Sequence, residues 1–213
     1  MPVSRPVSAA RRVGLLVLAI LVCTLAARAP IAAAQNQKTL DNLMAAYNGE
    51  SNAHAKYVEF AKKADQEGFA GAAALFRAAA QAEETHARNH AEVIKKLGGT
   101  PKAEIKLPAI GSTADNLKAA IEGESYERDT MYPGFIKEAL AVGNKDALRT
   151  FRMAVSAEAE HAKLYTQAST QLPSWKSGKT FYVCPVCGKT ITVIDFDKCP
   201  VCFTEKGKFK TVV

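Results

Sequence analysis

Two segments of this chain occur twice, at nearly the same spacing. Residues 76–87 read FRAAAQAEETHA and residues 151–162 read FRMAVSAEAEHA, so Phe, Arg, Glu and His recur at a shift of 75. The preceding segments, DNLMAAYNGES (41–51) and DNLKAAIEGES (115–125), recur at a shift of 74. Each copy ends in Glu-x-x-His, and residues three apart on a helix lie on one face. The duplication therefore predicts two similar helical halves that bring two Glu-x-x-His pairs together.

The apolar residues between 37 and 171 have helical rather than alternating spacing, and this range has room for four long helices. Breaking or capping residues mark the predicted boundaries: Gly68, Gly98-Gly99, Ser112 or Thr113, and Asn144. Residues 98–112 form a connection long enough to cross a bundle from end to end. Pro133-Gly134 predicts an irregularity inside the third helix. Two helical hairpins joined by one long crossover are typical of a ferritin-like four-helix bundle.

Seven side chains are the candidate ligands of a two-metal site in this bundle. They are the two Glu-x-x-His pairs, one glutamate from each mid-helix Gly-Glu, and a further glutamate on the third helix: Glu83, His86, Glu158, His161, Glu50, Glu124 and Glu127. Di-iron carboxylate bundles use one Glu from each of two helices and Glu-x-x-His from each of the other two. Carboxylates with few imidazoles suit iron or manganese better than copper.

A single Glu-x-x-His on a helix is more often a solvated surface pair than a metal site. Two copies, each with a matching Gly-Glu one helix earlier, favour the di-metal interpretation, because buried carboxylates are costly unless they are paired or bind metal. Four nearby residues complete no such pattern and are interpreted as surface residues or as residues behind the ligands: His54, His90, Glu84 and Glu160.

Four cysteines form two Cys-Pro-x-Cys pairs near the C-terminus: Cys184, Cys187, Cys199 and Cys202. Two such pairs at this spacing predict one tetrahedral metal site. Two structural disulfides are the alternative, which an oxidising compartment would favour. The spacing does not distinguish zinc, which would be structural, from iron, which carries single electrons. Residues 172–180 are a predicted linker, and residues 181–213 a small domain of short strands and turns.

The first 34 residues have the features of an export signal, and residues 35–171 form the predicted bundle domain. Arg11-Arg12 precede an apolar run at 13–27, and small residues favour cleavage after Ala34. This predicts a periplasmic or otherwise exported protein, with an uncleaved membrane anchor as the alternative. Residues 1–34 contain four arginines and no acid, so the formal charge of +7 falls to +3 without them. The remaining basic residues are scattered, which argues against a nucleic-acid partner.

The chain resembles the rubrerythrin family over about residues 37–213. The resemblance rests on Glu50 with Tyr57, on GESYERDTMYP (123–133), and on EETHA, EAEHA and the CPVCG…CPVC pairs. It implies that the seven candidate ligands bind two irons and the four cysteines one, with Glu127 as the extra ligand that lets one iron change ligands. It also implies that Tyr57 and Tyr132 hydrogen-bond to the site.

In function, the resemblance implies an oxidoreductase that reduces hydrogen peroxide to water in oxidative-stress defence. Electrons would come from an unidentified redox donor protein through the cysteine-bound iron, within a head-to-tail homodimer. Two other functions use the same residues: a ferroxidase or iron-handling protein, and a metal-stabilised interaction protein with a zinc knuckle.

Two features depart from the family pattern. The export signal implies a donor other than the usual reduced-nicotinamide chain. Phe203 follows Cys202 where the family usually has glycine, and a left-handed backbone there costs a bulky residue about 1–2 kcal/mol.

Overall fold

The computed structural model describes Met1 and residues 10–213, with backbone alone for residues 10–36. The chain divides into two compact units, Met1–Lys38 and Thr39–Val213. The predicted export signal, residues 1–34, lies outside the residues whose side chains are described. Within the part with described side chains, no helix is long and apolar enough to span a bilayer.

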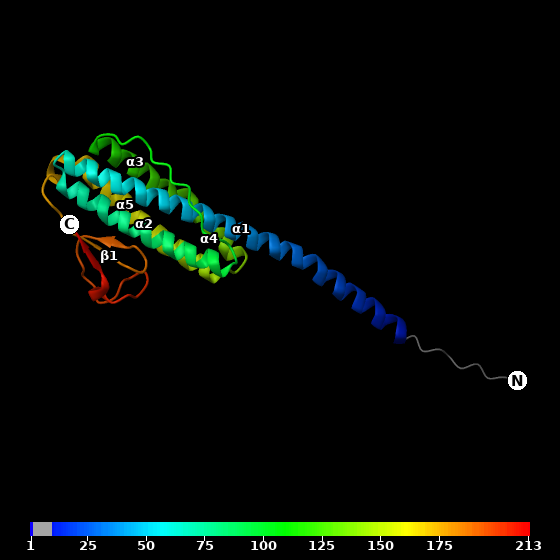
Figure 1. Cartoon of the computed structure of the whole chain (residues 1–213). Coiled ribbons are helices and arrows are strands. Elements are labelled where there is room, and N and C mark those ends of the chain that lie inside the picture. The colour runs from blue at the N-terminus through cyan, green and yellow to red at the C-terminus, as the bar shows by residue number, and fades with distance from the viewer. Residues whose placement is uncertain (2–9) are drawn as a thin grey trace. The chain divides into compact units, whose positions relative to one another are not determined.

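Long helices form a bundle, coloured from cyan to yellow in Figure 1. They are α1 (Ala10–Gln66) from Thr39 onward, α2 (Ala70–Lys96), α3 (Thr113–Tyr126), α4 (Tyr132–Ala141) and α5 (Lys145–Thr170). The predicted boundaries are confirmed: Ser112 and Asn144 are N-caps whose side chains accept hydrogen bonds from the N–H groups of residues 115 and 147. Gly68 and Gly98 end the two preceding helices with positive φ angles of 76° and 81°.

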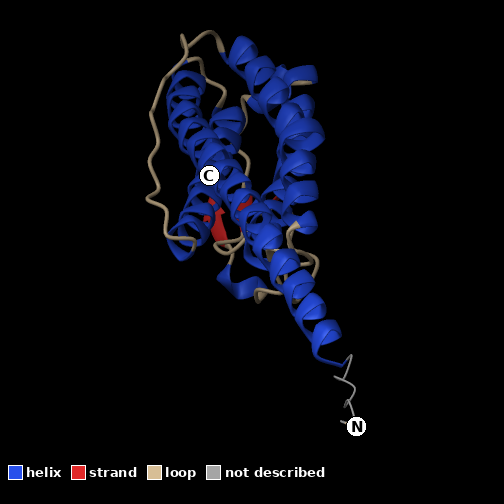
Figure 2. Ribbon diagram, turned by 90° about the vertical axis from the view of Figure 1, so that its right-hand side faces the viewer, coloured by secondary structure: helices blue, strands red, loops and turns tan. Residues whose placement is uncertain are grey.

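The connection between α2 and α3 runs along the bundle, as Figures 1 and 2 show. Two asparagines of α1 fix it there. The Glu104 N–H donates to Asn48 Oδ1 at 2.9 Å, and the Lys106 N–H donates to Asn52 Oδ1 at 2.7 Å. This crossover returns the chain to the end where α2 began, so α3 can repeat the direction of α2. The predicted ferritin-like topology is confirmed.

The predicted irregularity near Pro133 is a π-helix, η1 (Glu127–Met131), between α3 and α4. Pro133 lies in the first turn of α4 and has no N–H with which to continue the α-helical hydrogen bonds. One wider turn precedes it, and such turns are frequent at functional sites. The turn begins at Glu127, one of the predicted ligands.

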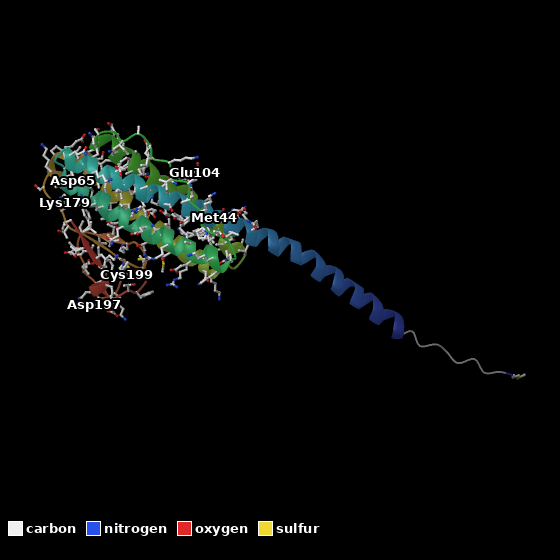
Figure 3. The ribbon with its side chains drawn as sticks, in the orientation of Figure 1. Met44, Asp65, Glu104, Lys179, Asp197 and Cys199 are labelled. Carbon is white, nitrogen blue, oxygen red and sulfur yellow. The ribbon has the colours of Figure 1, made fainter. Side chains whose placement is uncertain are left out.

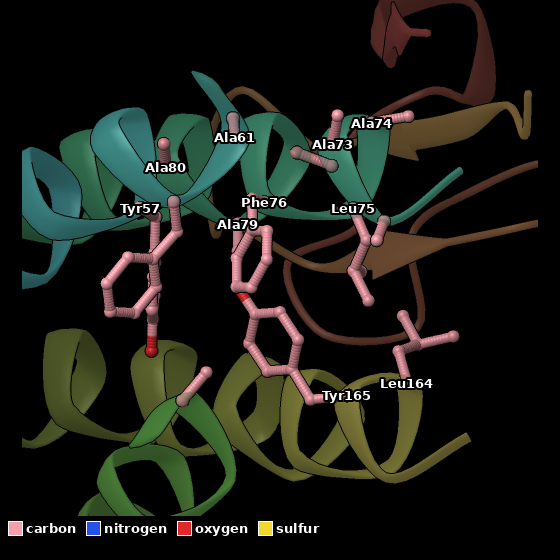
Figure 4. Packing of buried hydrophobic residues seen from close by; sticks show 14 of the residues in the cluster. Tyr57, Ala61, Ala73, Ala74, Leu75, Phe76, Ala79, Ala80, Leu164 and Tyr165 are labelled. Atoms are coloured by element: carbon pink, nitrogen blue, oxygen red, sulfur yellow. The ribbon is translucent and has the colours of Figure 1, made fainter. Parts of the chain in front are cut away.

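The bundle core beside the ligands consists of aromatic rings packed on alanines. Figure 4 shows Tyr57, Phe76 and Tyr165 reaching between the helices, with Ala79 and Ala80 beside them. Phe76 and Tyr165 have ring centroids 5.2 Å apart, and all three rings are almost fully buried. Alanines let the helices approach closely, and each buried ring of this size contributes about 1.5–3 kcal/mol. This end of the ligand site is therefore dry.

The C-terminal residues form a small three-stranded antiparallel sheet, shown red in Figure 2. Its strands are β1 (Phe181–Val183), β2 (Thr190–Ile191) and β3 (Lys210–Val212), in the order β2-β1-β3. Two 3₁₀ helices flank them, η2 (Leu172–Trp175) and η3 (Lys206–Lys208). Trp175 is buried and stacks on Phe181 at 6.3 Å. Strands this short bury little apolar area, so the domain depends on its cysteines for stability.

Candidate metal centres

Four helices bring six of the seven predicted bundle ligands together. Their ligand atoms form two groups of four, with all atoms of a group within 4.8 Å of one another: Glu50, Glu83, His86 and Glu158; and Glu83, Glu124, Glu158 and His161. All six side chains are buried. Glu83 and Glu158 belong to both groups, so each lies between two prospective ions. The repeated sequence thus forms two equivalent halves of one site.

The carboxylate oxygens show that the site is built for cations. Each of the four carboxylates has one buried oxygen without a hydrogen-bond partner: Glu50 Oε2, Glu83 Oε1, Glu124 Oε2 and Glu158 Oε1. Leaving a buried acceptor unsatisfied costs about 1–3 kcal/mol, and more when it is charged. Four such oxygens in a small dry volume fit two divalent cations, and hard oxygen ligands with two imidazoles fit iron or manganese.

His86 faces the metal site with one nitrogen and the cysteine domain with the other. Its Nδ1 lies 2.9 Å from Glu83 Oε2 and 3.1 Å from Glu158 Oε1. Its Nε2 lies 3.1 Å from the carbonyl oxygen of Cys187, which can only accept a hydrogen bond. The Nε2–H therefore donates outward and leaves Nδ1 as the metal-binding atom.

His161 is oriented in the same way by a threonine of β2. Its Nδ1 lies 3.0 Å from Glu158 Oε2, and its Nε2 lies 2.9 Å from Thr190 Oγ1. The Thr190 hydroxyl donates to the carbonyl of Gly188, so it accepts from the His161 Nε2–H. Both imidazoles are thus held from the cysteine domain. Sequence reasoning missed these partners, because neither Thr190 nor the Cys187 carbonyl carries a recognisable pattern.

The four carboxylates differ in pKa according to their neighbours. Burial, and then the charge of the neighbouring carboxylates, raises the pKa of the shared pair, Glu83 and Glu158. Burial also raises the pKa of Glu50 and Glu124, but hydrogen bonds and positive charge from the facing histidines outweigh it and lower the pKa below its usual value. Without metal, protons on the shared pair and on the histidines limit the repulsion.

The metal-free bundle is expected to lose stability as pH rises above about 6.5. Burial lowers the pKa of His86 and His161, but the carboxylates facing them outweigh it, so both pKa values lie well above 6.5. A group with a raised folded-state pKa stabilises the fold fully below its unfolded pKa, and this stability is lost as pH rises through the folded value. The melting temperature of chelator-treated protein should therefore fall as pH rises above about 6.5.

Zinc-loaded protein is the control for that experiment. Bound cations replace the protons, so its melting temperature should not fall over the same range. The lowered pKa values of Glu50 and Glu124 affect stability only below their usual value of 4.5, outside this range. Parallel curves for the two forms would contradict the assignment of these side chains as ligands.

Each predicted tyrosine binds a carboxylate from the opposite half of the bundle. Tyr57 OH donates to Glu124 Oε1 at 2.5 Å, and Tyr132 OH donates to Glu50 Oε1. His90, which the sequence placed at the surface or behind the ligands, is buried and lies 3.0 Å from the Tyr132 hydroxyl. Each tyrosine occupies one carboxylate oxygen and leaves the other oxygen facing the metal site.

Glu127 is the predicted ligand that does not join either group. It is half-buried on η1, and its Oε1 lies 3.9 Å from the position a Cβ would take on Gly49, next to Glu50. Burial, and then the charges of Glu50 and Glu158, raises its pKa well above the usual value. Glu127 therefore lies beside the site, within its electric field.

The remaining acidic and histidine candidates lie outside the site. His54 is half-buried, and its Nδ1 lies 2.8 Å from the carbonyl of Ala80. Glu160 forms a surface ion pair with Lys163 at 3.1 Å, and Glu84 is exposed. Their interpretation as surface residues or residues behind the ligands fits these positions.

The four cysteines converge on one point. All four sulfurs lie within 4.8 Å of one another, and Cys184 Sγ lies 3.5 Å from Cys202 Sγ. A tetrahedral ion with metal–sulfur bonds of about 2.3 Å sets its sulfurs about 3.8 Å apart, so the arrangement fits one ion. A hydrogen bond from Cys187 lowers the pKa of Cys184 to about 5. None of the four cysteines forms a disulfide in the structure. Figure 3 labels Cys199, which lies in the sheet domain.

The two cysteine turns have the same backbone but different surroundings. Gly188 and Phe203 each follow the second cysteine of a pair, with φ angles of 74° and 62°. A Cβ on Gly188 would come within 2.2 Å of His86 Nε2, so only glycine fits there. Phe203 is 75% exposed and meets no such obstacle. Phe203 takes the left-handed backbone for which the family usually has glycine, at a cost of about 1–2 kcal/mol, so the distortion expected of this turn is not seen.

Known proteins share both the sequence and the fold. The family model described as Rubrerythrin matches residues 41–169. Nigerythrin of Nitratidesulfovibrio vulgaris is 41% identical over 172 residues, which cover 80% of this chain and 85% of that protein. Rubrerythrin-2 of Clostridium acetobutylicum is 38% identical, over 83% of this chain and 97% of that protein. A structure of fully reduced, all-ferrous nigerythrin superposes with a TM-score of 0.76 at 38% identity, over 81% of this chain and 86% of that one. The chain belongs to the rubrerythrin family.

Proposed function

We propose that this protein is a non-haem di-iron peroxidase that reduces hydrogen peroxide to water, with electrons entering through an iron bound by the four cysteines. The solved nigerythrin structure is described as all-ferrous, which supports iron in both sites of this chain. Two ferrous ions held by these ligands would supply the two electrons that cleavage of one O–O bond requires.

The observation that carries this proposal is the position of His86 between the two sites. Its Nδ1 faces Glu83 and Glu158, and its Nε2 contacts the carbonyl of Cys187 at 3.1 Å. Arg88 and Asn89, also on α2, donate to the carbonyls of residues 185 and 186 at 2.8 Å each. One turn of α2 therefore binds the first cysteine turn firmly against a bundle ligand, which gives an electron a short bonded path.

This contact lies within one chain in the structure. The predicted head-to-tail homodimer, in which the same contact would join two chains, stays a prediction.

The side chains around the ligands supply order and protons. Burial, and then the charge of the bonded carboxylate, raises the pKa of Tyr57 and Tyr132 well above 10. Both hydroxyls therefore stay protonated and can hold Glu124 and Glu50 in place. Reduction of hydrogen peroxide to two waters consumes two protons as well as two electrons. Glu127, whose pKa burial raises and which lies beside the site, is placed to donate one of them or to turn inward as a ligand.

The test is reoxidation of the fully reduced, iron-loaded protein in single turnover. We expect hydrogen peroxide to restore the ferric absorption at least about 100-fold faster than air-saturated buffer, because the site is arranged for a two-electron oxidant. Stopped-flow absorption measures both rates. Equal rates would favour the iron-handling alternative and contradict a peroxidase.

The Glu127→Ala variant separates chemistry from metal binding. Because six other ligands remain in the bundle, it is expected to retain its iron but to react with peroxide at least about tenfold more slowly. Glu122→Ala, which replaces an exposed glutamate one turn earlier, should change neither quantity. If Glu127→Ala lost iron and rate to the same degree, its role would be metal binding alone.

A further inference from the structure

A groove of about 410 Å³ lies where α5 meets the second cysteine turn. Its lining combines three cations, four apolar side chains and one cysteine: Lys145, Arg149 and Arg152; Leu148, Met153, Val201 and Phe203; and Cys202. No lining residue is acidic. The neighbouring groove, by contrast, includes Glu92 and Asp146. The basic groove is therefore distinct in charge from the surface beside it.

The three cations lie on one face of α5, because they are four and three residues apart. Each is exposed, and no residue from 37 to 213 forms an ion pair with Lys145, Arg149 or Arg152 within 4.0 Å. They extend along about 10 Å of helix, since seven residues rise about 1.5 Å each. A row of unpaired cations of this length matches the surface of a macromolecule better than a single small anion.

The floor and rim of the groove lead to the cysteine site. Met153 packs against the cluster formed by Cys184, Cys187 and Cys199. Those three cysteines are fully buried, whereas Cys202 is half-buried and lines the groove. The groove is thus the place where the four-sulfur site comes nearest to solvent.

Phe203 forms the rim beside Cys202, and it is strained and exposed at once. Its φ angle of 62° disfavours any side chain, and 75% of its surface is open to solvent. Burial in this chain does not explain an aromatic ring in such a position. Aromatic and arginine side chains are the residue types that contribute most to protein interfaces.

We propose that this groove is the docking site of an acidic one-electron carrier protein, the reductant of the cysteine-bound iron. The inference rests on the proposed function, since it identifies where the electrons enter. Acidic side chains of the carrier pair with the three cations, and its apolar rim around the redox group packs on Phe203. One electron leaves the reduced carrier, which is oxidised, and enters the four-sulfur site, where ferric iron becomes ferrous. No bond forms or breaks and no proton moves.

The binding test uses oxidised flavodoxin as an acidic carrier, so that no electron transfer takes place. Titration calorimetry at low salt compares the wild-type protein with the double variant Arg149→Glu/Arg152→Glu. We expect the Kd for flavodoxin to rise at least about tenfold in the variant, and the difference to shrink at roughly 0.5 M salt. The matched control is Lys118→Glu/Lys137→Glu, which changes the net charge equally on α3 and α4 and should leave the Kd near the wild-type value. An equal effect in both variants would overturn the proposal, because it would show that only net charge matters.

Phe203→Gly provides an independent readout. Glycine accepts the left-handed backbone, so the variant should unfold at a temperature no lower than that of the wild type. Its Kd for flavodoxin should nevertheless rise at least about fivefold, because the rim contact is lost. An unchanged Kd would remove Phe203 from the docking site.

Rates of reduction separate this inference from the proposed function. Duroquinol, a small neutral reductant, should reduce the cysteine-bound iron equally in wild type and in Arg149→Glu/Arg152→Glu, whereas reduced flavodoxin should act at least about tenfold more slowly on the variant. Weaker binding of the variant to flavodoxin, with no reaction of the reduced wild type with peroxide, would support the docking site and contradict the peroxidase. If reduced flavodoxin acted equally fast on the wild type and the variant, and the wild type still turned over peroxide, the result would contradict the docking site and support the peroxidase. If the variant bound vesicles of anionic lipid more weakly than the wild type but bound flavodoxin equally well, the groove would be assigned to a membrane surface and the proposal overturned.

Discussion

The Glu158→Gln variant is expected to lose both metal ions from the bundle. Glu158 belongs to both ligand groups, and its two oxygens lie 3.1 Å from His86 Nδ1 and 3.0 Å from His161 Nδ1. Glutamine keeps the size of the side chain but removes the negative charge that Glu158 would offer to both ions. The affinity for each ion should fall at least about 100-fold, because mutation of a residue that only supports a ligand already lowers metal affinity by about 10–100-fold. Metal analysis after dialysis against a weak chelator measures the loss.

Two controls make that result specific. Glu50 belongs to one group only, so Glu50→Gln should lose one ion and keep most of the other. Glu160→Gln changes a half-buried residue of the same helix that pairs with Lys163 and belongs to neither group, so it should lose neither ion. The metal-free Glu158→Gln protein should be at least as stable as the metal-free wild type, because burial and neighbouring carboxylates raise the pKa of Glu158. Retention of both ions by Glu158→Gln would show that it does not bridge them.

The Cys199→Ser variant is expected to unfold the cysteine domain while the bundle remains folded. The domain has three strands of two or three residues, and Cys199 is fully buried in its small core. Metal binding supplies about 10–16 kcal/mol to small domains of this kind, so its loss leaves little to oppose unfolding. Trp175, the sole tryptophan of the chain, is buried against Phe181 and reports the change. Its fluorescence should shift to longer wavelength at a temperature where the wild type is unchanged.

The function of the same variant follows from the position of His86. Steady-state peroxide turnover with a protein donor should fall at least about 100-fold, since the proposed electron entry site is gone. A bundle reduced chemically should still react once with peroxide, although its iron should bind more weakly without the carbonyl of Cys187. Ser174→Ala, an exposed change in η2, should affect neither fluorescence nor turnover. Wild-type turnover by Cys199→Ser would show that electrons reach the bundle by another route.

Much of the fold follows from local chemistry and could be predicted. Capping by Ser112 and Asn144, the positive φ of Gly68, and the break at Pro133 depend on a few neighbouring residues. The duplicated ligands could also be predicted to converge, because charged residues on apolar helix faces need one another. The family and the fold inferred from these residues are confirmed.

The rest depends on contacts between distant residues. No local pattern shows that Glu83 and Glu158 are shared by both groups, whereas Glu50 and Glu124 each belong to one. Nor does any pattern show that both imidazoles bind the sheet domain, because their partners there are a backbone carbonyl and the hydroxyl of a single threonine, Thr190. Glu127 joins neither group and begins the wider turn of η1, whose register only the folded helix defines.

The unequal surroundings of the two cysteine turns have a consequence for how relatives diverge. The ring of His86 leaves no space for a side chain at Gly188, so natural selection has one acceptable residue there. Position 203 faces solvent, so a residue there only has to accept a left-handed backbone. The contact with His86 therefore fixes the first turn, whereas the residue at position 203 can change without disturbing a ligand of the bundle.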